Sequence, residues 1–424
     1  MNHLRDRNAD VRELVADEGV SAASYVREIL DVAHGRRLWS EAAKERWRLR
    51  DIEAITPAAR VKRLGKKLLC SIFANQNGLE LLSHLEHRLS NSEVVRSYRE
   101  YFRASRPRLV FNGSHVHSKA ALAAVHAAKS LGIPTATFLF SWDNLTSQGR
   151  IIPTYDYYLV WNDQIKDQLL EIYPRIAPSQ VIVTGTPQFD FHLDPALYWS
   201  REKLCRELDL DPSRPIVLYS TGMANHIAGE EVIIEAIADM LAQMSDLGPP
   251  QLLVREYAKG PSDHLDDLKR RRSDIRFPRV RWEKQWLTPE PEDVPLLTNT
   301  LKYADVGINV ASTISLELCM FDVPVINVSY IGRGVKVVFD YRRYYEFEHY
   351  RPLVESGAID VVRDENRMPQ AIREALTQRA ARSAQRIALV EQMFGPTLDG
   401  KSGQRVAEAL LRLATADNRE SALR

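Results

Sequence analysis

Short apolar segments that alternate with helical segments constrain this fold more strongly than any other feature of the sequence. From Arg106 onward, runs rich in Val, Ile, Leu and aromatic residues are followed by segments with helical spacing of apolar residues. Strands that alternate with helices form parallel sheets through right-handed crossovers. The predicted strands are Leu109–Phe111, Pro134–Phe140, Tyr157–Trp161, Val181–Val183, Ile216–Tyr219, Leu252–Val254, Val280–Trp282, Val306–Val310 and Val325–Val328.

The predicted strands fall into two series, and a chain of 424 residues is long enough for two hydrophobic cores. The sequence therefore predicts two Rossmann-like, doubly wound α/β domains that face a cleft. The part before the first strand is helical and irregular. The predicted divisions are a helical N-terminal region (1–105), a first Rossmann-like domain (106–190), a linker (191–214), a second Rossmann-like domain (215–395) and a C-terminal helix with tail (396–424).

The composition argues against several classes of protein. A net charge of +1 gives no electrostatic case for a nucleic-acid partner. The three cysteines, Cys70, Cys205 and Cys319, are far apart and offer no metal spacing and no disulfide framework, which is typical of a reducing cytosol. No apolar run is long enough to span a bilayer, and no zinc-ligand cluster or glycine-rich phosphate loop is present. We therefore expect a cytoplasmic protein that uses no metal.

One stretch departs from this balance of charge. Between Arg36 and Lys67 the sequence has 11 basic and 4 acidic residues, with Leu38, Trp39 and Trp47 interleaved. Such a stretch is either a basic surface that binds the inner face of an anionic membrane or a solvated helix face whose tryptophans pack on the domain. Peripheral membrane contact through residues 36–67 is therefore one of two interpretations.

The segment from Val306 to Val328 predicts a nucleotide site. A strand ends at Ser312 and Thr313, and a helix follows at once. The start of a helix offers unpaired N–H groups and small hydroxyl side chains to a phosphate. Glu317 lies one turn further along the same face, where its carboxylate suits the hydroxyls of a ribose. The alternative is that Ser312 and Thr313 cap the helix and Glu317 compensates its dipole.

Other strand ends of the second series add candidates. Ser220 and Gly222 form a short polar turn with room for a phosphate, and Arg255 follows an apolar strand and suits a diphosphate. The alternative for Arg255 is an ion pair with Glu256 or another nearby acid. His349 lies in a tyrosine-rich segment, where it either reaches the sugar or phosphate of a donor or packs as a loop residue.

In the first series, His115 and Asp143 follow neighbouring predicted strands. A histidine or carboxylate at such a position can take a proton from a hydroxyl group. The alternative is that Asp143 caps a turn and His115 is an ordinary loop residue. The sequence therefore gives two candidates for a general base.

With these residues in view, the chain resembles the GT-B class of nucleotide-sugar glycosyltransferases, in particular bacterial surface-polysaccharide enzymes. The same architecture is shared by CDP-glycerol-type polyol-phosphate transferases and hydrolysing UDP-sugar 2-epimerases. The resemblance covers roughly residues 106–410 and rests on Thr184–Asp190, Val217–Gly222, Leu301–Val306, Ala311–Thr313 with Glu317, Asp322–Ile326, Asp399-Gly400 and Arg405.

This resemblance implies a metal-independent glycosyltransferase whose co-substrate is a nucleotide-diphosphate sugar and which needs no other cofactor. The acceptor would be a hydroxyl of a glycan or a lipid-linked molecule, in cell-surface glycan or glycolipid synthesis. The first domain would supply the base. Three alternatives remain: a polyol-phosphate transferase, a hydrolysing UDP-sugar 2-epimerase and a non-catalytic nucleotide-sugar-binding protein. The resemblance assigns the diphosphate and ribose to Ser312, Thr313 and Glu317, and the phosphate site to Ser220, Gly222 and Arg255.

Overall fold

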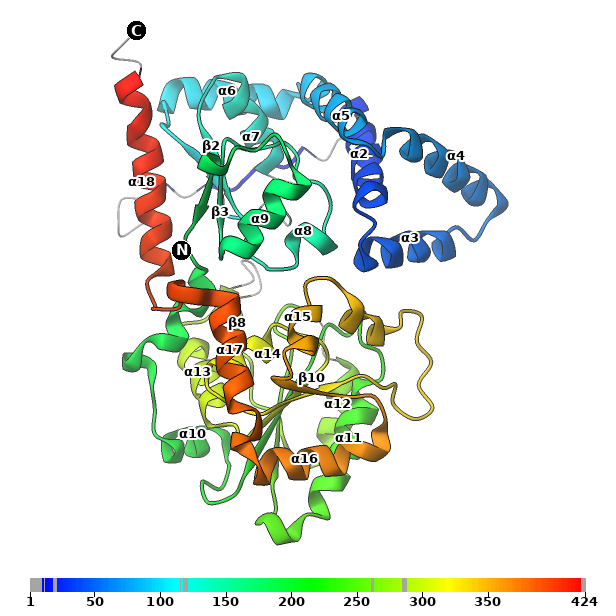
Figure 1. The fold of residues 1–424 in the computed structure, drawn as a ribbon, viewed down its shortest axis with the longest axis vertical. Coiled ribbons are helices and arrows are strands. Elements are labelled where there is room, and N and C mark those ends of the chain that lie inside the picture. The colour runs from blue at the N-terminus through cyan, green and yellow to red at the C-terminus, as the bar shows by residue number, and fades with distance from the viewer. Residues whose placement is uncertain are drawn as a thin grey trace. The chain divides into compact units, whose positions relative to one another are not determined.

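The computed structural model describes residues 10, 12–17, 21–114, 116, 121–260, 263–283 and 288–420. The chain packs as two compact units: unit 1 contains Met1–Thr186 and Ser402–Arg424, and unit 2 contains Pro187–Lys401. Each unit contains a parallel sheet (Figure 1). The predicted fold class, α/β with two Rossmann-like domains and a helical N-terminal region, is confirmed.

Helices α2 to α6 form the helical region that precedes the sheet of unit 1. Each begins after a residue whose side chain accepts a hydrogen bond from a backbone N–H of the first turn. These N-cap residues are Ser21, Ser40, Thr56, Asn75 and Ser92. None of the helices in the described part of the chain is long and apolar enough to cross a membrane. The helices are α2 (Ala22–Leu38), α3 (Glu41–Glu53), α4 (Pro57–Phe73), α5 (Gln76–Leu89) and α6 (Glu93–Ser105).

The sheet of unit 1 has four parallel strands in chain order, β1-β2-β3-β4, so its strand order does not reverse. The final helix of the chain belongs to this unit, where Arg405 Nε donates to the carbonyl oxygen of Thr184. The elements are β1 (Val110–Asn112), α7 (Ala121–Ser130), β2 (Thr135–Phe138), α8 (Asn144–Ser147), β3 (Tyr157–Val160), α9 (Asp163–Ile172), η1 (Pro178–Gln180), β4 (Val181–Val183) and α18 (Ser402–Glu420).

The sheet of unit 2 has six parallel strands in the order β12-β11-β10-β5-β6-β7. The chain winds outward in one direction from β5 and in the other from β10, so the order reverses between these two strands. The strands are β5 (Ile216–Ser220), β6 (Gln251–Arg255), β7 (Ile275–Arg276), β10 (Val306–Asn309), β11 (Val325–Val328) and β12 (Ile359–Val362).

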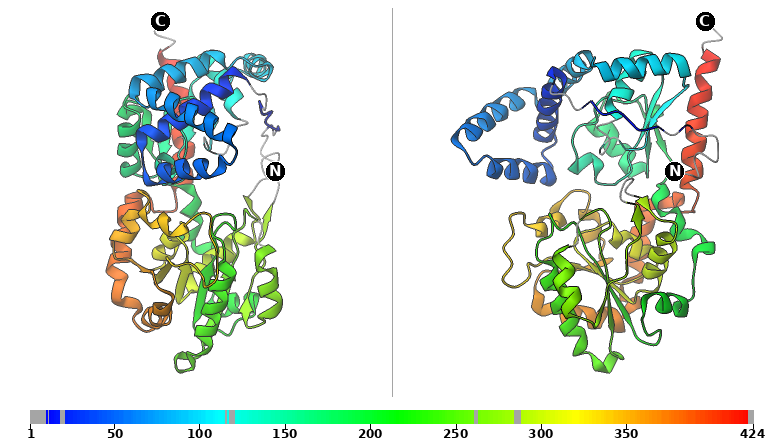
Figure 2. Two further views of the ribbon diagram at one scale, coloured as in Figure 1. Left: turned by 90° about the vertical axis from the view of Figure 1, so that its right-hand side faces the viewer. Right: turned by 180° about the vertical axis from the view of Figure 1, so that it is seen from behind.

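Helices cover both faces of this sheet, because right-handed crossovers in opposite directions lie on opposite sides (Figure 2). Helices α11 (Glu230–Ala242), α12 (Asp266–Arg271) and α16 (Met368–Thr377) share one hydrophobic core with the strands. On the other face, α13 packs on α10 and α14, and α14 packs on α17. The remaining elements are η2 (Pro187–Leu193), η3 (Pro195–Leu197), α10 (Arg201–Leu208), η4 (Ser245–Leu247), η5 (Asp263–Leu265), α13 (Asp293–Tyr303), α14 (Ile314–Met320), η6 (Tyr341–Glu346), α15 (Arg351–Glu355), η7 (Glu365–Arg367), η8 (Arg379–Arg382), α17 (Ser383–Phe394) and η9 (Gly395–Thr397).

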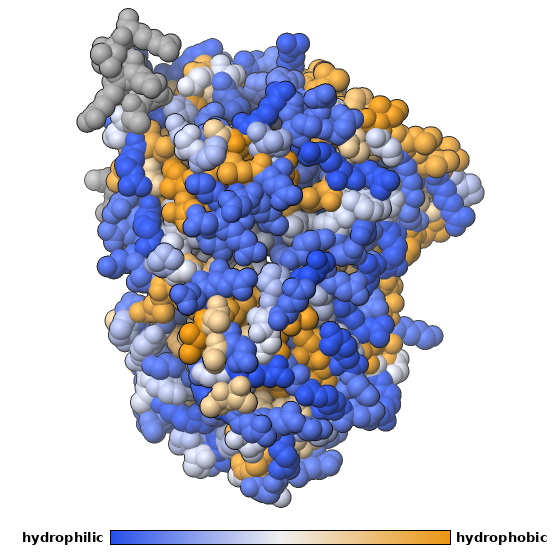
Figure 3. Space-filling model, in the orientation of Figure 1, coloured by the Kyte–Doolittle hydropathy of each residue, from blue (hydrophilic) through white to orange (hydrophobic). Residues whose placement is uncertain are grey.

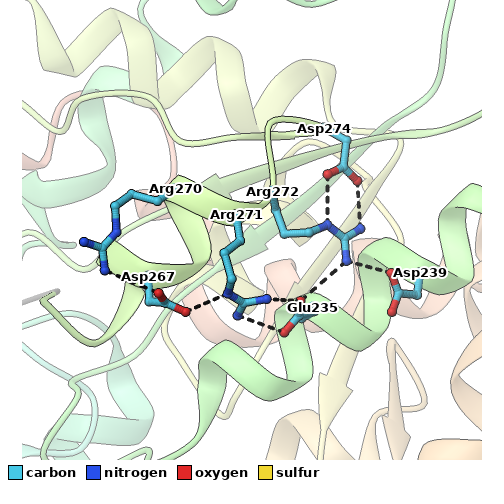
Figure 4. A network of polar contacts seen from close by, with 7 residues as sticks. All are labelled: Glu235, Asp239, Asp267, Arg270, Arg271, Arg272 and Asp274. Carbon is cyan, nitrogen blue, oxygen red and sulfur yellow. Dashed lines mark hydrogen bonds and ion pairs between the residues drawn. The ribbon is translucent and has the colours of Figure 1, made fainter.

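A network of ion pairs joins α11 to α12 at one side of this sheet (Figure 4). Arg271 contacts Glu235 of α11 and Asp267 of its own helix, each at 2.6 Å. Arg272 contacts Asp239 at 2.6 Å and Asp274 at 2.8 Å. Each exposed ion pair of this kind contributes little to the stability of a fold, so the main effect of the network is to fix the packing of α11 against α12.

The predicted strand Val280–Trp282 is wrong as a member of the parallel sheet. Trp282–Glu283 (β8) pairs instead with Thr288–Pro289 (β9) in an antiparallel ladder, and the edge of the parallel sheet is β7. Both β7 and β8 are two residues long. A segment this short shows no periodic pattern of apolar residues, so the sequence gives no basis for choosing between them.

Candidate functional site

The strand order of the unit 2 sheet reverses between β5 and β10. In open α/β sheets, ligands bind outside the carboxyl ends of the strands at this position. Ser220 is the last residue of β5, and Gly222 lies just beyond it. Ser312 and Thr313 follow β10 and precede α14. Four of the predicted donor-binding residues therefore lie at the switch point of the sheet.

A row of polar side chains crosses the sheet at this point. Ser220 lies opposite Asn309 of β10 on one side and opposite Arg255 of β6 on the other. Asn309 in turn lies opposite Asn327 of β11. Residues in register in a parallel sheet project from the same face, and strands buried on both faces are normally apolar throughout. We call Asn327, Asn309, Ser220 and Arg255 the polar row.

Two donors of the polar row have no hydrogen-bond partner in the described part of the chain. They are Nδ2 of Asn309 and Nη1 of Arg255, which flank Ser220 and are buried. A buried donor without a partner costs about 1–3 kcal/mol, and in a native structure it calls for an explanation. An anion or an ordered water bound at the row would supply the missing acceptors.

The other terminal nitrogen of Arg255 belongs to a buried ion pair. Nη2 donates to Oδ2 of Asp293 at 2.6 Å, and both side chains are almost completely buried. Asp293 also accepts hydrogen bonds from the backbone N of Arg281 at 3.2 Å and from Nε1 of Trp282 at 3.1 Å. The ion pair that the sequence offered as an alternative is therefore present, with Asp293 as the acid, whereas Glu256 contacts Lys269 at 2.9 Å.

The turn after β10 has an unusual backbone conformation. Ala311 has a φ angle of 30°, and residues other than glycine rarely adopt positive φ values. Its N–H donates to the hydroxyl of Tyr345 at 3.1 Å, and that hydroxyl donates to the carbonyl oxygen of Val328 at 2.7 Å. Strained backbone of this kind persists only where the surroundings hold it. Tyr345 is therefore part of what shapes the predicted phosphate turn.

A buried polar network holds the same turn from behind. Oδ1 of Asn309 accepts from the backbone N of Ser312 at 3.2 Å, from Oγ of Ser315 at 3.1 Å and from Nδ2 of Asn327 at 3.2 Å. The hydroxyl of Tyr350 donates to Oδ1 of Asn327 at 2.6 Å and lies 3.0 Å from Oγ of Ser315. Burial raises the pKa of Tyr350 well above its ordinary value, so this hydroxyl stays protonated and able to donate.

The predicted ribose acceptor, Glu317, forms a pair with His192. Oε2 of Glu317 lies 2.8 Å from Nε2 of His192, and Nδ1 of the same ring lies 3.2 Å from Oγ1 of Thr298. His192 belongs to η2 and is fully buried, whereas the side chain of Glu317 is 14% exposed. Glu317 therefore lies at the surface of the site with one oxygen held by the protein. Thr313, which precedes α14, makes no capping hydrogen bond with its side chain.

The loop after β5 encloses a buried carboxyl group. The backbone N of Gly222 points at both oxygens of Glu230, each at 3.1 Å, and the hydroxyl of Tyr219 lies 3.1 Å from Oε1. Burial raises the pKa of Glu230 to about 8. A Cβ at Gly222 would lie 2.2 Å from Cδ1 of Ile227, so a larger residue here would require the end of that side chain to shift. The N–H of Gly222 is thus already used within the protein.

His349 lies between η6 and α15, directly before Tyr350 of the buried network. Its ring is partly exposed and meets Phe347 edge-on, with ring centroids 5.9 Å apart. His349 therefore directly precedes Tyr350, which helps to hold the turn after β10. Its role toward a donor stays a prediction.

The two predicted bases belong to unit 1. Asp143 precedes the short helix α8, and its carboxylate accepts hydrogen bonds from Oγ of Ser141 and, at 2.5 Å, from Oγ of Ser147. Both partners are side-chain hydroxyls, and Asp143 makes no capping hydrogen bond from its side chain to the backbone of α8, so the turn-capping alternative is not confirmed. His115 lies outside the described residues. The assignment of a base therefore stays a prediction.

A cavity of about 540 Å³ in unit 2 lies beside α10, the end of β7 and the start of α13. Its lining mixes basic and acidic side chains, among them Arg279, Arg281, Glu207 and Glu292, and includes none of the predicted donor-binding residues. In the described part of the chain, no group of three or more His, Cys, Asp or Glu side chains is placed to hold a metal ion. The polar row therefore remains the best-defined candidate site.

Several residues of the site were not predicted from the sequence. Asn309 and Asn327 interrupt apolar runs that were predicted as strands, which is a signal that a polar side chain has a buried partner. Tyr345 and Tyr350 lie in a tyrosine-rich segment without a periodic pattern. His192 gives no local signal, because its partners Thr298 and Glu317 are more than 100 residues away.

No protein-family model matches this sequence, and no curated protein matches it. Solved structures do match. The UDP-GlcNAc 2-epimerase from Neisseria meningitidis, solved with bound UDP-GlcNAc, is 13% identical, and the alignment covers 78% of this chain and 82% of that chain with a TM-score of 0.50. A glycosyltransferase from Rickettsia africae is 15% identical over 76% of this chain and 83% of that chain, with a TM-score of 0.44. The wall teichoic acid polymerase TagF is 14% identical over 62% and 57%, with a TM-score of 0.43.

Proposed function

We propose that this chain, which has the GT-B fold, is a glycosyltransferase that moves a sugar from a nucleotide-diphosphate donor to a hydroxyl acceptor. The observation that most supports the proposal is the polar row at the switch point of the unit 2 sheet. Two of its buried donors, on Asn309 and Arg255, have no acceptor among the described residues, and a diphosphate is rich in acceptor oxygens. The row lies where open α/β sheets bind their ligands.

Each part of the site has a role in this proposal. Nη1 of Arg255 and the hydroxyl of Ser220 would contact the phosphates, together with the turn at Ser312 and Thr313. The oxygen of Glu317 that His192 does not hold would accept hydrogen bonds from the ribose. As the sugar leaves, negative charge develops on the diphosphate, and donors already fixed at that position stabilise it without reorganisation. No metal ion is needed for this step.

The acceptor in the proposal is a hydroxyl of a glycan or a lipid-linked molecule used in cell-surface synthesis at the cytoplasmic side. A base from unit 1, Asp143 or His115, would take the proton of that hydroxyl. Replacement of a general base lowers turnover by about 10²–10⁴-fold. We therefore expect Asp143→Asn or His115→Ala to lose turnover while keeping donor affinity. Full turnover in both variants would place the base elsewhere.

A binding panel tests the donor assignment directly. UDP, GDP, CDP, ADP and TDP, each alone and as common sugar conjugates, are added while thermal unfolding is followed. A ligand at a hundredfold excess over its Kd stabilises the folded state by roughly 2.7 kcal/mol. We expect a selective shift with one nucleoside diphosphate and a loss of that shift in Arg255→Lys. The absence of a shift with every member would count against a donor site.

The reaction then separates the alternatives that share this fold. A transferase releases its nucleoside diphosphate only when an acceptor is present, whereas a hydrolysing epimerase releases UDP from a UDP-sugar without one. A polyol-phosphate transferase responds to CDP-activated polyols and releases CMP. Donor binding with no release under any of these conditions would favour a non-catalytic binding protein.

A further inference from the structure

Helix α4 of unit 1 leaves its apolar side chains in solvent. It has 17 residues, and Cys70 is its one buried side chain. Soluble helices normally bury their apolar stripe against the core. The exposed apolar residues of α4 on one side of the helix are Val61 at 71%, Leu64 at 59%, Leu68 at 63% and Ile72 at 67% exposure. We call these four residues the α4 face.

Helical geometry places the α4 face on a single narrow side. Its residues are spaced by three, four and four positions, which brings successive side chains above one another. The opposite side of the helix holds the contacts with the rest of unit 1: Arg63 and Lys67 contact Asp51 at 2.9 Å and 2.7 Å, and Cys70 Sγ lies 3.7 Å from the carbonyl oxygen of Ile29. The α4 face is thus the side of the helix that the described residues of unit 1 leave uncovered.

The patch extends beyond the helix. Ile52, in the last turn of α3, is 49% exposed, and Ile55, between α3 and α4, is 76% exposed. Leu81 and Leu85 of the neighbouring helix α5 are exposed as well. Figure 3 shows apolar residues gathered at the edge of the molecule where Figure 1 labels α4 and α5. Contiguous apolar surface of this kind marks a site of interaction with another molecule or a membrane.

The rim of the α4 face is basic. Arg60 and Lys62 are exposed and lie on its two sides by helical spacing. The stretch from Arg36 to Lys67 has 11 basic and 4 acidic residues, and six of the basic residues are ion-paired within unit 1. The remaining excess of positive charge attracts anions. A second copy of this chain would set one basic rim against another, which opposes self-association through this face. A lipid surface with acidic headgroups matches both the apolar centre and the basic rim.

The two tryptophans of the basic stretch, Trp39 and Trp47, pack within unit 1 and are not part of the α4 face. Trp39 and Trp47 meet edge-on with ring centroids 5.6 Å apart. Arg36 stacks over Trp39 at 4.1 Å and Arg63 over Trp47 at 4.5 Å. Trp47 packs against the core formed by α2, α4 and α5. Of the two interpretations of the stretch 36–67, packing therefore applies to the tryptophans, whereas Ile52, Ile55 and the α4 face supply exposed apolar side chains.

We infer that unit 1 docks on an anionic membrane surface with α4 parallel to the bilayer plane. The α4 face enters the boundary between headgroups and acyl chains, while Arg60 and Lys62 contact the acidic headgroups. This inference stands independently of the proposed donor site, which belongs to unit 2.

Vesicle co-sedimentation of the full chain tests the inference, with phosphatidylcholine vesicles that either contain or lack phosphatidylserine. We expect binding to the phosphatidylserine vesicles that weakens with added salt. The double substitution Leu64→Gln and Leu68→Gln should weaken this binding at least about tenfold, because each leucine gives up its transfer into the apolar layer. Leu411→Gln is the matched control, since Leu411 is 66% exposed on α18 of the same unit.

Two results would overturn the inference. One is failure of the unaltered chain to bind phosphatidylserine vesicles at low salt. The other is equal vesicle binding by the unaltered chain and the double variant. Analytical ultracentrifugation tests the alternative that a second copy of the chain binds the α4 face. If the unaltered chain is a dimer, the double variant is a monomer and neither binds vesicles, the α4 face is a dimer interface instead. Because all substituted side chains are exposed, the variants should keep the thermal stability of the unaltered chain.

Discussion

Oε2 of Glu317 lies 2.8 Å from Nε2 of His192, although 125 residues separate them in the sequence. The contact joins the first segment of unit 2 to the helix that starts at the switch point of the sheet. It also holds one oxygen of the carboxylate, and the side chain of Glu317 stays 14% exposed. The pair therefore links the architecture of the unit to the proposed ribose contact.

The substitution Glu317→Gln tests that contact. A hydrogen bond to a charged group contributes about 1.5–3 kcal/mol, so we expect nucleoside diphosphate affinity to fall at least about tenfold. Isothermal titration calorimetry with the nucleotide that the panel selects measures this change. His192→Gln is the control for a purely positional effect. An affinity of Glu317→Gln within about twofold of the unaltered protein would contradict the ribose role.

The buried pair of Arg255 and Asp293 predicts strong coupling between two substitutions. Arg255→Met leaves the carboxylate of Asp293 buried without its cation, which typically costs about 3–5 kcal/mol. Asp293→Asn together with Arg255→Met removes the charge as well, so the double variant should regain much of the lost stability. Urea unfolding of both single variants and the double variant measures this coupling. Additive losses would show that the pair is not the reason for the burial of Arg255.

The network around Tyr350 predicts that removing its hydroxyl lowers the stability of the protein while the fold is kept. Tyr350→Phe removes a hydroxyl that contacts Asn327 and Ser315, and leaves those buried groups with one partner fewer. We expect the free energy of unfolding to fall by about 1–3 kcal/mol. Tyr25→Phe is the control, because Tyr25 is 58% exposed. Its effect should stay within about 0.5 kcal/mol, and equal effects of the two substitutions would argue against the network.

Glu230 predicts a pH dependence with a definite sign. Burial raises its pKa from 4.5 to about 8 in the folded state. Between these values the folded protein keeps a proton that the unfolded chain has released, so stability falls as pH rises, by up to about 1.4 kcal/mol per pH unit. The contribution is fully present below the unfolded pKa and is lost as pH passes the folded value.

Urea unfolding across this pH range measures the effect. Glu230→Gln cannot release a proton at this position, so its stability relative to the unaltered protein should rise from acid to mildly alkaline pH. Glu231→Gln, at the next position of α11, is the matched control. Parallel stability curves for the unaltered protein and Glu230→Gln would contradict the buried, protonated state of this carboxyl group.

Much of the local structure follows from the sequence. The strands Val181–Val183 and Val325–Val328 have the predicted bounds, and the polar residues at Ser220 and Ser312 were recognised at strand ends. Apolar spacing reports which side of a segment is buried, and this depends on the segment alone. The two-residue strand β7 lacks such spacing, and the strand β12 was not predicted.

The sequence by itself therefore determined the α/β class, the alternation of elements and the polar strand ends at which a site was expected. Only the tertiary structure decided that β10 lies beside β5, and so that Asn327, Asn309, Ser220 and Arg255 form one row. It alone paired Arg255 with Asp293 and turned the α4 face toward solvent. Strand order, register and side-chain partners depend on packing between distant segments, which no local pattern records.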